Sequence, residues 1–405
     1  MKTYLNYNLR SYLCLLVLTM VVLSCQESAV EGKYINVSNT MDMERKSETV
    51  EVDLSRTGLD LSNNNAEDLK VKDADSGAIL LSQLMDLDED GNFDLLLFQV
   101  DMLPNQNRRF LLTYEEVGED VSQIGKSTYS RFVPERTDDY AWENDRVAFR
   151  TYGPDAQRRA ENKLPEGTLS SGVDAWLKKV DYPIIDKWYA QHLQRDSSYH
   201  VDHGEGYDPY HVGSSRGIGG VGIWIDDSLH ISKNFISHKT LVNGPIRTVF
   251  ELTYAPREVD GVRFNETKHI SLDLGSHLYR SEVLLDGGHM LPNLTVGISL
   301  HDKEGEVKTS PDEGWFRYWE PMDGSQLGLG IVVDPKVVQA YKDHRVDYRD
   351  GSQLLVMTDV NNGKAVYYAG FAWDQSGHFI DANSWDNYLK EFSRRLQQPL
   401  EVSYE

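Results

Sequence analysis

The sequence RTVFELTY at residues 247–254 decides the fold class, because from Phe250 to Tyr254 it alternates apolar and polar side chains as a half-buried β-strand does. KHISLDL at residues 268–274 repeats the pattern. Further strand-like runs occupy residues 221–225, 229–235, 279–285, 294–300, 315–320, 328–334, 353–358 and 365–373. Turns are marked by Asp226-Asp227, Asn243-Gly244-Pro245 and Asp260-Gly261. Ten or more strands without alternating helices predict a mainly β protein with large antiparallel sheets packed as a sandwich.

Two domains are predicted along the chain. Residues 34–125 form a small N-terminal β domain, with strand-like runs at residues 48–53, 69–72, 95–100 and 109–114. A linker near residues 118–137 leads to a large catalytic β-sandwich at residues 126–405. The C-terminal helix of this domain is expected to start at a Ser384 cap. Its apolar face would contain Trp385, Tyr388, Leu389, Phe392 and Leu396.

Two segments before residue 199 are read from their periodicity. Residues 146–152 alternate, so that Arg146, Arg150 and Tyr152 share one face, which either lines a cleft or belongs to a solvated edge strand. Residues 172–194 show helical spacing of apolar side chains, interrupted at Pro183. This predicts two short helices or one kinked helix.

The first 24 residues resemble a lipoprotein signal peptide. Lys2 and Arg10 precede an apolar run at residues 12–23, and the sequence VLSC ends at Cys25. Cys25 would carry the lipid, and residues 25–33 would be a tether. Because the other cysteine, Cys14, lies in the removed peptide, no disulfide is expected. The predicted location is the envelope of a Gram-negative bacterium, with the lipid anchor in a membrane that the sequence does not specify.

The overall charge excludes one class of partner. With 41 basic and 64 acidic residues, the chain has a formal net charge of -23, whereas nucleic-acid binding needs a basic surface. An anionic ligand would need locally placed arginines or a bound cation.

A calcium site is one reading of the acidic sequence DLDEDGNFD at residues 86–94. Alternate acids followed by a glycine resemble the first half of a calcium loop, with ligands from Asp86, Asp88, Asp90 and Asp94. Leu97 occupies the position where an EF-hand has its bidentate glutamate. The other reading is a tight Asp-Gly hairpin turn without metal.

The strongest candidate for a functional site is the segment at residues 199–220. It contains three histidines, three tyrosines, several acids and an arginine, but few side chains that build a core. Such a loop more often serves a site than a scaffold. His200, His203, Glu205 and His211 also offer enough ligands for zinc or calcium, although their spacing matches no zinc signature.

Four separate motifs resemble the domain-of-unknown-function family 4861: WENDRVAFR at 142–150, KVDYPII at 179–185, HVDHGEG at 200–206 and NGPIRT at 243–248. The resemblance covers most of the mature chain. It implies an envelope lipoprotein of a polysaccharide-utilisation system, with a β-sandwich of the galactose-mutarotase type. Some members of the family resemble dehydratases that act on uronic-acid-containing oligosaccharides.

A uronate dehydratase removes the acidic C5 proton and expels water from C4, which requires a base, an acid and a partner for the carboxylate. We expect His203 to be the base, with Tyr207 or Tyr210 as acid and His200 as a substitute. Arg216, Arg150 or Arg247 would pair with the carboxylate. Trp142, Asn144 and Glu205 complete the predicted substrate-binding set. This chemistry requires no cofactor.

Three alternatives remain open. If a glycan leaves in place of water, the same chemistry makes the protein a polysaccharide lyase. A glycoside hydrolase would need two carboxylates about 5–9 Å apart, such as Glu205 with Glu320 or Asp145. A non-catalytic glycan-binding lipoprotein would need the aromatic residues but not the concentrated histidines and tyrosines.

Overall fold

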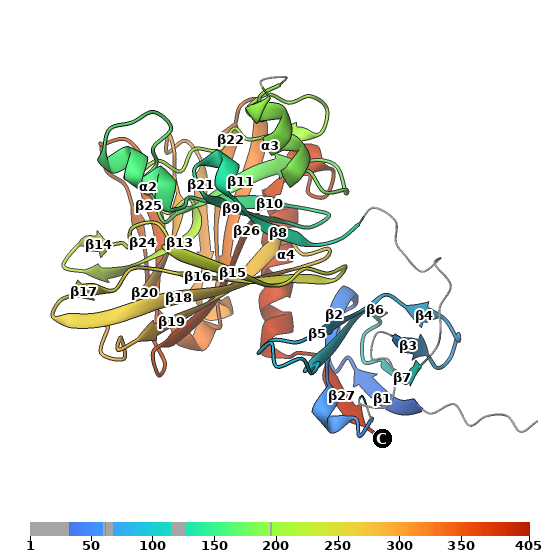
Figure 1. The fold of residues 1–405 in the computed structure, drawn as a ribbon. Helices are drawn as coiled ribbons and strands as arrows, with labels where there is room; N and C mark the ends of the chain where they lie inside the picture. The colour runs from blue at the N-terminus through green and yellow to red at the C-terminus, as the bar shows by residue number, and fades with distance from the viewer. Residues whose placement is uncertain (1–31, 60, 62–67, 115–125, 195–196) are drawn as a thin grey trace, which may run out of the picture.

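The computed structural model describes residues 32–59, 61, 68–114, 126–194 and 197–405 (Figure 1). The predicted signal peptide, Cys25 and residues 118–125 of the predicted linker lie outside these residues. Within the described residues, no helix is long and apolar enough to cross a membrane.

The small domain contains two antiparallel sheets. One has the strand order β27-β1-β7-β3-β4 and the other β2-β6-β5. Their bounds are β1 Gly32–Ser38, β2 Arg45–Asp53, β3 Leu69–Asp73, β4 Ile79–Leu80, β5 Ser82–Met85, β6 Leu95–Met102, β7 Asn107–Tyr114 and β27 Glu401–Tyr404. The strands share one apolar core that includes Ile35, Val52 and Phe98.

The last strand of the chain belongs to this small domain. β27 pairs antiparallel with β1, with Ile35 opposite Tyr404 and Val37 opposite Val402. The C-terminus therefore lies beside the first described strand (Figure 1). The prediction that the large domain extends to residue 405 is therefore corrected, because β27 belongs to a sheet of the small domain.

The large domain is an antiparallel β-sandwich, as predicted. A five-stranded sheet, β14-β13-β20-β25-β24, faces the sheet β15-β16-β18-β19-β26-β23-β22-β21, in which β17 also pairs with β18. Their bounds are β13 Ile218–Ile225, β14 Ser228–His230, β15 Ser237–Val242, β16 Arg247–Thr253, β17 Arg257–Val259, β18 Val262–Asp273, β19 Leu278–Asp286, β20 Leu294–Ser299, β21 Glu306–Ser310, β22 Trp315–Met322, β23 Ser325–Val332, β24 Val338–His344, β25 Gln353–Thr358 and β26 Lys364–Trp373. Inward-facing residues of both sheets, such as Val221, Phe250 and Val296, form one continuous core.

A third sheet, β12-β11-β10-β9-β8, corrects two predictions. Its strands are β8 Tyr129–Val133, β9 Asp139–Glu143, β10 Ala148–Thr151, β11 Val173–Lys178 and β12 Gly206–Tyr207. β10 is a central strand rather than an edge strand. The first half of the predicted helical region is β11, and only α3, Ile185–Leu193, is helical. Every residue of β11 is buried, so both of its faces are covered and the sequence shows no strand alternation.

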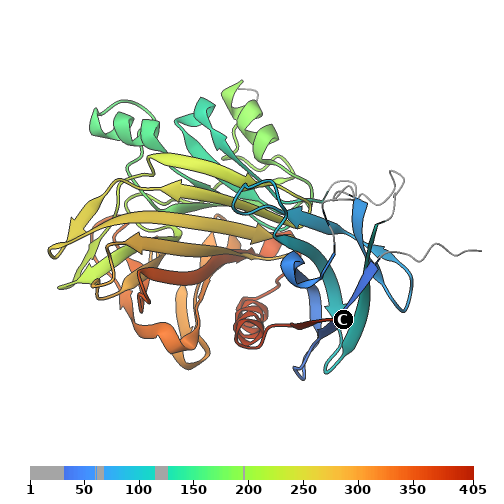
Figure 2. The same ribbon diagram turned by 60° about the horizontal axis from the view of Figure 1, so that its bottom comes forward.

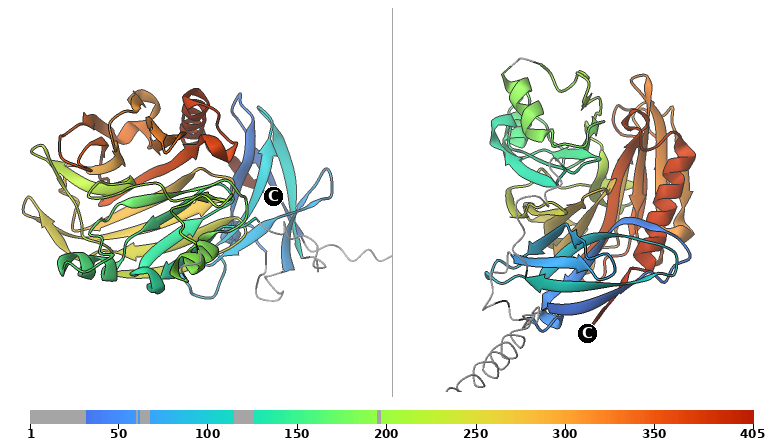
Figure 3. Two further views of the ribbon diagram at one scale, coloured as in Figure 1. Left: turned by 90° about the horizontal axis from the view of Figure 1, so that it is seen from above. Right: turned by 90° about the vertical axis from the view of Figure 1, so that its right-hand side faces the viewer.

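The helices cover the sheets from different sides (Figure 3). α2, Pro154–Glu161, was not predicted, whereas α4, Ala382–Gln397, was. The N-cap of α4 is Asp381 rather than the predicted Ser384, because Asp381 accepts a hydrogen bond from the Ser384 backbone NH (2.8 Å) and Ser384 completes a capping box. Trp385 and Leu389 of α4 pack on β23, where Gly328 and Gly330 leave room for them.

The acidic segment at residues 86–94 connects β5 to β6. Carboxylate oxygens of Asp86, Asp88 and Asp94 lie within 4.8 Å of one another, while Asp90 stays outside this group. The same carboxylates already accept hydrogen bonds from backbone NH groups, as Asp94 does from Leu87 (2.6 Å) and Asp86 from Gly91 (3.0 Å). Their donor set fits a hard cation. These hydrogen bonds also stabilise the turn by themselves, so the alternative of a hairpin turn without metal stays open.

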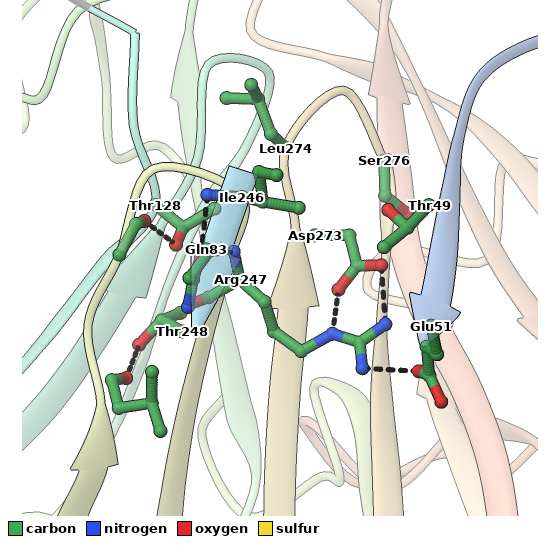
Figure 4. A network of polar contacts seen from close by, with 12 residues as sticks. Thr49, Glu51, Gln83, Thr128, Ile246, Arg247, Thr248, Asp273, Leu274 and Ser276 are labelled. Atoms are coloured by element: carbon green, nitrogen blue, oxygen red, sulfur yellow. Dashed lines mark hydrogen bonds and ion pairs between the residues drawn. The ribbon is translucent and has the colours of Figure 1, made fainter. Parts of the chain in front are cut away.

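Polar side chains clamp the small domain to the large one (Figure 4). Gln83 of β5 accepts hydrogen bonds from the NH groups of Ile246 and Arg247 (2.8 Å each) and donates one to the carbonyl of Arg247 (2.8 Å). The side chain of Arg247 binds Glu51 of β2 (2.5 Å) and both oxygens of Asp273 (2.5 and 2.8 Å). Because Gln83 is nearly fully buried, these hydrogen bonds are shielded from water.

We predict that Gln83→Ala lowers the free energy of unfolding by about 1–3 kcal/mol, because two buried NH groups lose their acceptor. Gln339→Ala is the matched control, since Gln339 is an exposed glutamine that also donates two hydrogen bonds. Denaturant unfolding of both variants checks this. Equal stability of the two variants would show that Gln83 is not a clamp.

Candidate functional site

A cavity of about 420 Å³ lies beside the segment at residues 199–217, which we call the His/Tyr loop. Pro209 and His211 of this loop form one wall. The other walls are the turn at residues 301–304 after β20, residues 320–323 at the end of β22, and residues 347–350 with Ser352 between β24 and β25. Four distant parts of the chain thus meet at this pocket.

Arg150 holds the His/Tyr loop in place. Its guanidinium donates to Asp174 of β11 (Nε, 2.9 Å), to Asp208 of the loop (3.0 Å) and to the hydroxyl of Tyr199 (3.0 Å). Burial alone would lower the pKa of Arg150, but the charges around it, Asp174 first, raise it overall. An arginine committed to these partners is not available for a substrate carboxylate, contrary to the prediction.

His301 and Glu320 form a buried acid–base pair in the pocket. The Nδ1 of His301 lies 2.7 Å from a Glu320 oxygen, and its Nε2 donates to the main-chain carbonyl of His211 (3.0 Å). Burial raises the pKa of Glu320, with an opposing effect from His301. Burial lowers the pKa of His301, but Glu320 raises it overall. The pair therefore holds a proton more readily than either group does in water.

The backbone at His301 is also unusual, because its φ of +36° lies in the left-handed region that L-residues seldom adopt. Such strain is concentrated at sites where the position of a side chain matters. Here it directs the imidazole between Glu320 and the loop.

His211 forms a second pair on the pocket wall. Its Nε2 lies 3.1 Å from Asp350, and Arg349 approaches the same nitrogen at 3.4 Å. Among the described residues, its Nδ1 has no hydrogen-bond partner, and the side chain is 52% exposed. A carboxylate that fixes one ring nitrogen and leaves the other free is the arrangement of a general base.

The two predicted acids, Tyr207 and Tyr210, lie behind the pocket wall rather than on it. Tyr207 donates to Asp323 (3.1 Å), and burial together with Asp323 raises its pKa to about 12. Tyr210 is buried against His301 with the ring centroids 4.7 Å apart, and burial raises its pKa well above the usual range. Its hydroxyl has no partner in the described chain.

The first half of the loop lies away from the pocket. His203 is exposed and, within the described residues, makes no side-chain hydrogen bond or ion pair. His200 contacts the carbonyl of Asp208 (2.8 Å), and Glu205 binds Lys187 (2.6 Å) and Tyr182. In the part of the chain that the structure describes, the only group of three possible metal ligands is the one at residues 86–94, so the predicted ligands of this loop are not gathered.

The other predicted binding residues have structural roles. Arg216 is fully buried, donates to Ser171 (2.9 Å), and burial lowers its pKa to about 10. Arg247 is the interdomain clamp described above. Trp142 is buried against Phe149 and Phe250, and Asn144 donates to the carbonyls of Asp273 (2.6 Å) and Ser276 (2.7 Å). None of these four side chains lines the pocket.

The pocket instead contains residues that sequence reasoning missed, above all His301, Asp350 and Arg349. Glu320 was considered only as a partner of Glu205. Among the described residues, six carboxylates line the pocket, against two cationic side chains and two histidines: Asp302, Glu304, Glu320, Asp323, Asp347 and Asp350 against Lys303, Arg349, His211 and His301. Such a lining supports proton transfer and binding of sugar hydroxyls.

Comparison with known proteins assigns the family. A family model described as a domain of unknown function, DUF4861, matches residues 37–402. The uncharacterized protein P7 of Formosa agariphila is 47% identical over 381 residues, which cover 94% of this chain and 95% of that protein. Two solved structures from Enterococcus faecalis, a glycosyl hydrolase family 38 protein and an α-mannosidase, are similar with TM-scores of 0.49 and 0.45 at 11% identity. Each match covers 92% of this chain, and the chain spans about half the length of these two proteins (47% and 46%). The chain belongs to the DUF4861 family.

Proposed function

We propose that the protein is a carbohydrate-active enzyme that eliminates water at a uronic-acid residue of an acidic oligosaccharide. The observation that carries this proposal is the meeting of two histidine–carboxylate pairs, His211–Asp350 and His301–Glu320, in one pocket. One pair has a free ring nitrogen and the other holds a proton, which are the two states that acid–base catalysis requires. The lipoprotein-like signal sequence supports an activity in the cell envelope.

Each chemical step has a residue in the pocket. The free Nδ1 of His211 takes the C5 proton, and the electrons of that C–H bond form the C4–C5 double bond. The C4–O bond breaks, and the oxygen leaves as water after receiving the proton of the His301–Glu320 pair. Arg349 and Lys303 are the cationic side chains of the pocket and would receive the uronate carboxylate. They replace the predicted Arg150, Arg216 and Arg247.

The decisive experiment incubates the purified protein with uronate-bearing oligosaccharides and follows the ultraviolet absorbance of a conjugated unsaturated uronate together with product mass. Loss of one water with a gain in absorbance supports the dehydratase. Cleavage with a gain in absorbance would make the protein a polysaccharide lyase. Binding without any product would make it a glycan-binding protein.

Hydrolysis is the second candidate, and the excess of carboxylates in the pocket favours it. Glu320, whose pKa is raised by burial, is suited to protonate a glycosidic oxygen, and a neighbouring carboxylate would activate water. Glu205, the predicted partner of Glu320, does not line the pocket and is neutralised by Lys187. Cleavage without any gain in absorbance would establish hydrolysis and exclude elimination.

We predict that His211→Gln lowers kcat by about 100-fold or more, because the proton acceptor is lost. His203→Gln is the matched control, since His203 is an exposed histidine of the same loop. It should retain activity close to that of the unmodified protein. Steady-state kinetics on both variants, with circular dichroism to verify folding, makes the comparison. If kcat fell strongly in His203→Gln but not in His211→Gln, His203 would be the base and His211 would not.

A second prediction concerns pH. Glu320 raises the pKa of His301, so the pair keeps its proton, and activity, to higher pH than a free imidazole would. Activity that needs this proton is present below the pKa and is lost as pH rises through it. Glu320→Gln should therefore shift the alkaline limb of kcat/KM to lower pH and lower the rate at pH 8. An unchanged alkaline limb would remove the pair from the mechanism.

A further inference from the structure

A second and larger cavity, of about 1460 Å³, lies between the small domain, the outer face of the nine-stranded sheet and α4. We call it the interdomain cleft. Figure 2 shows α4 end-on beside the small domain. Both supply residues that line this cleft. In the part of the chain that the structure describes, no residue lines both the cleft and the pocket of the His/Tyr loop. The volume of the interdomain cleft exceeds the range of about 300–1,000 Å³ that is usual for small-molecule pockets, so the cleft is large enough for an extended ligand.

The floor of the cleft is a polar face of the sheet. Ser271 of β18, Arg280 of β19 and Tyr368 of β26 are register partners across three adjacent strands. Arg280 binds Glu282 (2.5 Å) and is 36% exposed. His269, which lies two residues before Ser271, binds Glu251 of β16 (2.9 Å) and is 35% exposed. Hydroxyl, guanidinium, imidazole and carboxylate groups thus lie in rows, partly open to solvent.

Two sets of polar contacts connect the walls of the cleft to each other. Arg247 and Gln83 join the small domain to the sheet on one side, as described above. On the other side, Arg395 of α4 binds Glu48 of β2 (3.0 Å), and Arg45 donates to the carbonyl of Gln398. Pairing of β27 with β1 fixes the same wall. The small domain, the sheet and α4 that line the cleft are therefore joined to one another directly.

We propose that the interdomain cleft binds a segment of an acidic polysaccharide, separately from the pocket where chemistry takes place. The class of ligand rests on the proposed function. Alternating donors and acceptors match sugar hydroxyls, and the rings of Tyr368 and Phe392 supply apolar surface for sugar faces.

The lining of the cleft carries less excess negative charge than the chain as a whole. Among the described residues, five cationic side chains line it beside six carboxylates, and its arginines are ion-paired: Lys46, Arg146, Arg247, Arg280 and Arg395 beside Glu44, Glu48, Glu51, Asp273, Glu282 and Glu391. The chain as a whole has 41 basic and 64 acidic residues. Within the described residues, two histidines besides His269 also line the cleft, so its lining repels anions less strongly than the chain as a whole does.

The test measures binding and turnover separately. The retardation of Glu320→Gln protein in native gels that contain alginate or polygalacturonate reports binding, with dextran as a neutral comparison. Ser271→Trp should weaken binding at least tenfold by filling the cleft, and Arg280→Gln should weaken it severalfold. Arg109→Gln is the matched control, because Arg109 is a half-exposed, ion-paired arginine outside both cavities. Turnover of short uronate oligosaccharides by Ser271→Trp in an otherwise unmodified protein should stay unchanged.

The outcomes separate the two proposals. If neither acidic polysaccharide retards the protein, or if Ser271→Trp binds as Arg109→Gln does, the cleft is not a polysaccharide site. If the cleft variants lose binding while no oligosaccharide is ever converted, the cleft site stands and the proposed enzymatic function fails. Equal losses of short-oligosaccharide turnover and of binding in Ser271→Trp would also overturn the proposal of a separate site.

Discussion

Placing a guanidinium in a protein interior costs several kcal/mol unless carboxylates and hydrogen-bond acceptors surround it, and Arg150 is surrounded in this way. Asp174, Asp208 and Tyr199 all bind it, and Asp139 lies 3.7 Å away. Two of these partners belong to the His/Tyr loop. Charge thereby adds to the burial of Tyr199, Tyr207, Tyr210 and Val212 in fixing a glycine-rich segment with few aliphatic side chains.

The candidate site depends on this fixed loop. The backbone NH of Asp208 also donates a hydrogen bond to the carbonyl of Tyr199 (2.7 Å). The two residues of the loop that bind Arg150 are therefore also bonded to each other. The chain then continues through Pro209 to His211, whose carbonyl accepts a hydrogen bond from the imidazole of His301. The same loop that looked catalytic in sequence does reach a pocket with acid–base groups, but through its second half. Its first half is held over α3, where Glu205 binds Lys187.

The fold class was predictable because residues such as Thr248, Phe250 and Leu252 alternate with residues that face outward. β11 was not predictable in this way, since its six residues are all buried and Trp176 packs on Trp188 and Tyr189 of α3 as a helical residue would. The site was predictable only as a region. His301 is 90 residues from His211, and Asp350 is 139 residues from it, and no local pattern links residues so far apart. Arginines were the least predictable, because in a sequence a buried structural arginine looks the same as one that binds a ligand.

The pairing of β27 with β1 has a consequence for how the chain folds. The small domain contains the first described strand, yet one of its edge strands, β27, follows the whole large domain in the sequence. Until residues 401–404 emerge, β1 has an open edge that offers unpaired NH and carbonyl groups to other chains. The sheet of the small domain is therefore complete only when a segment from the far end of the large domain has joined it.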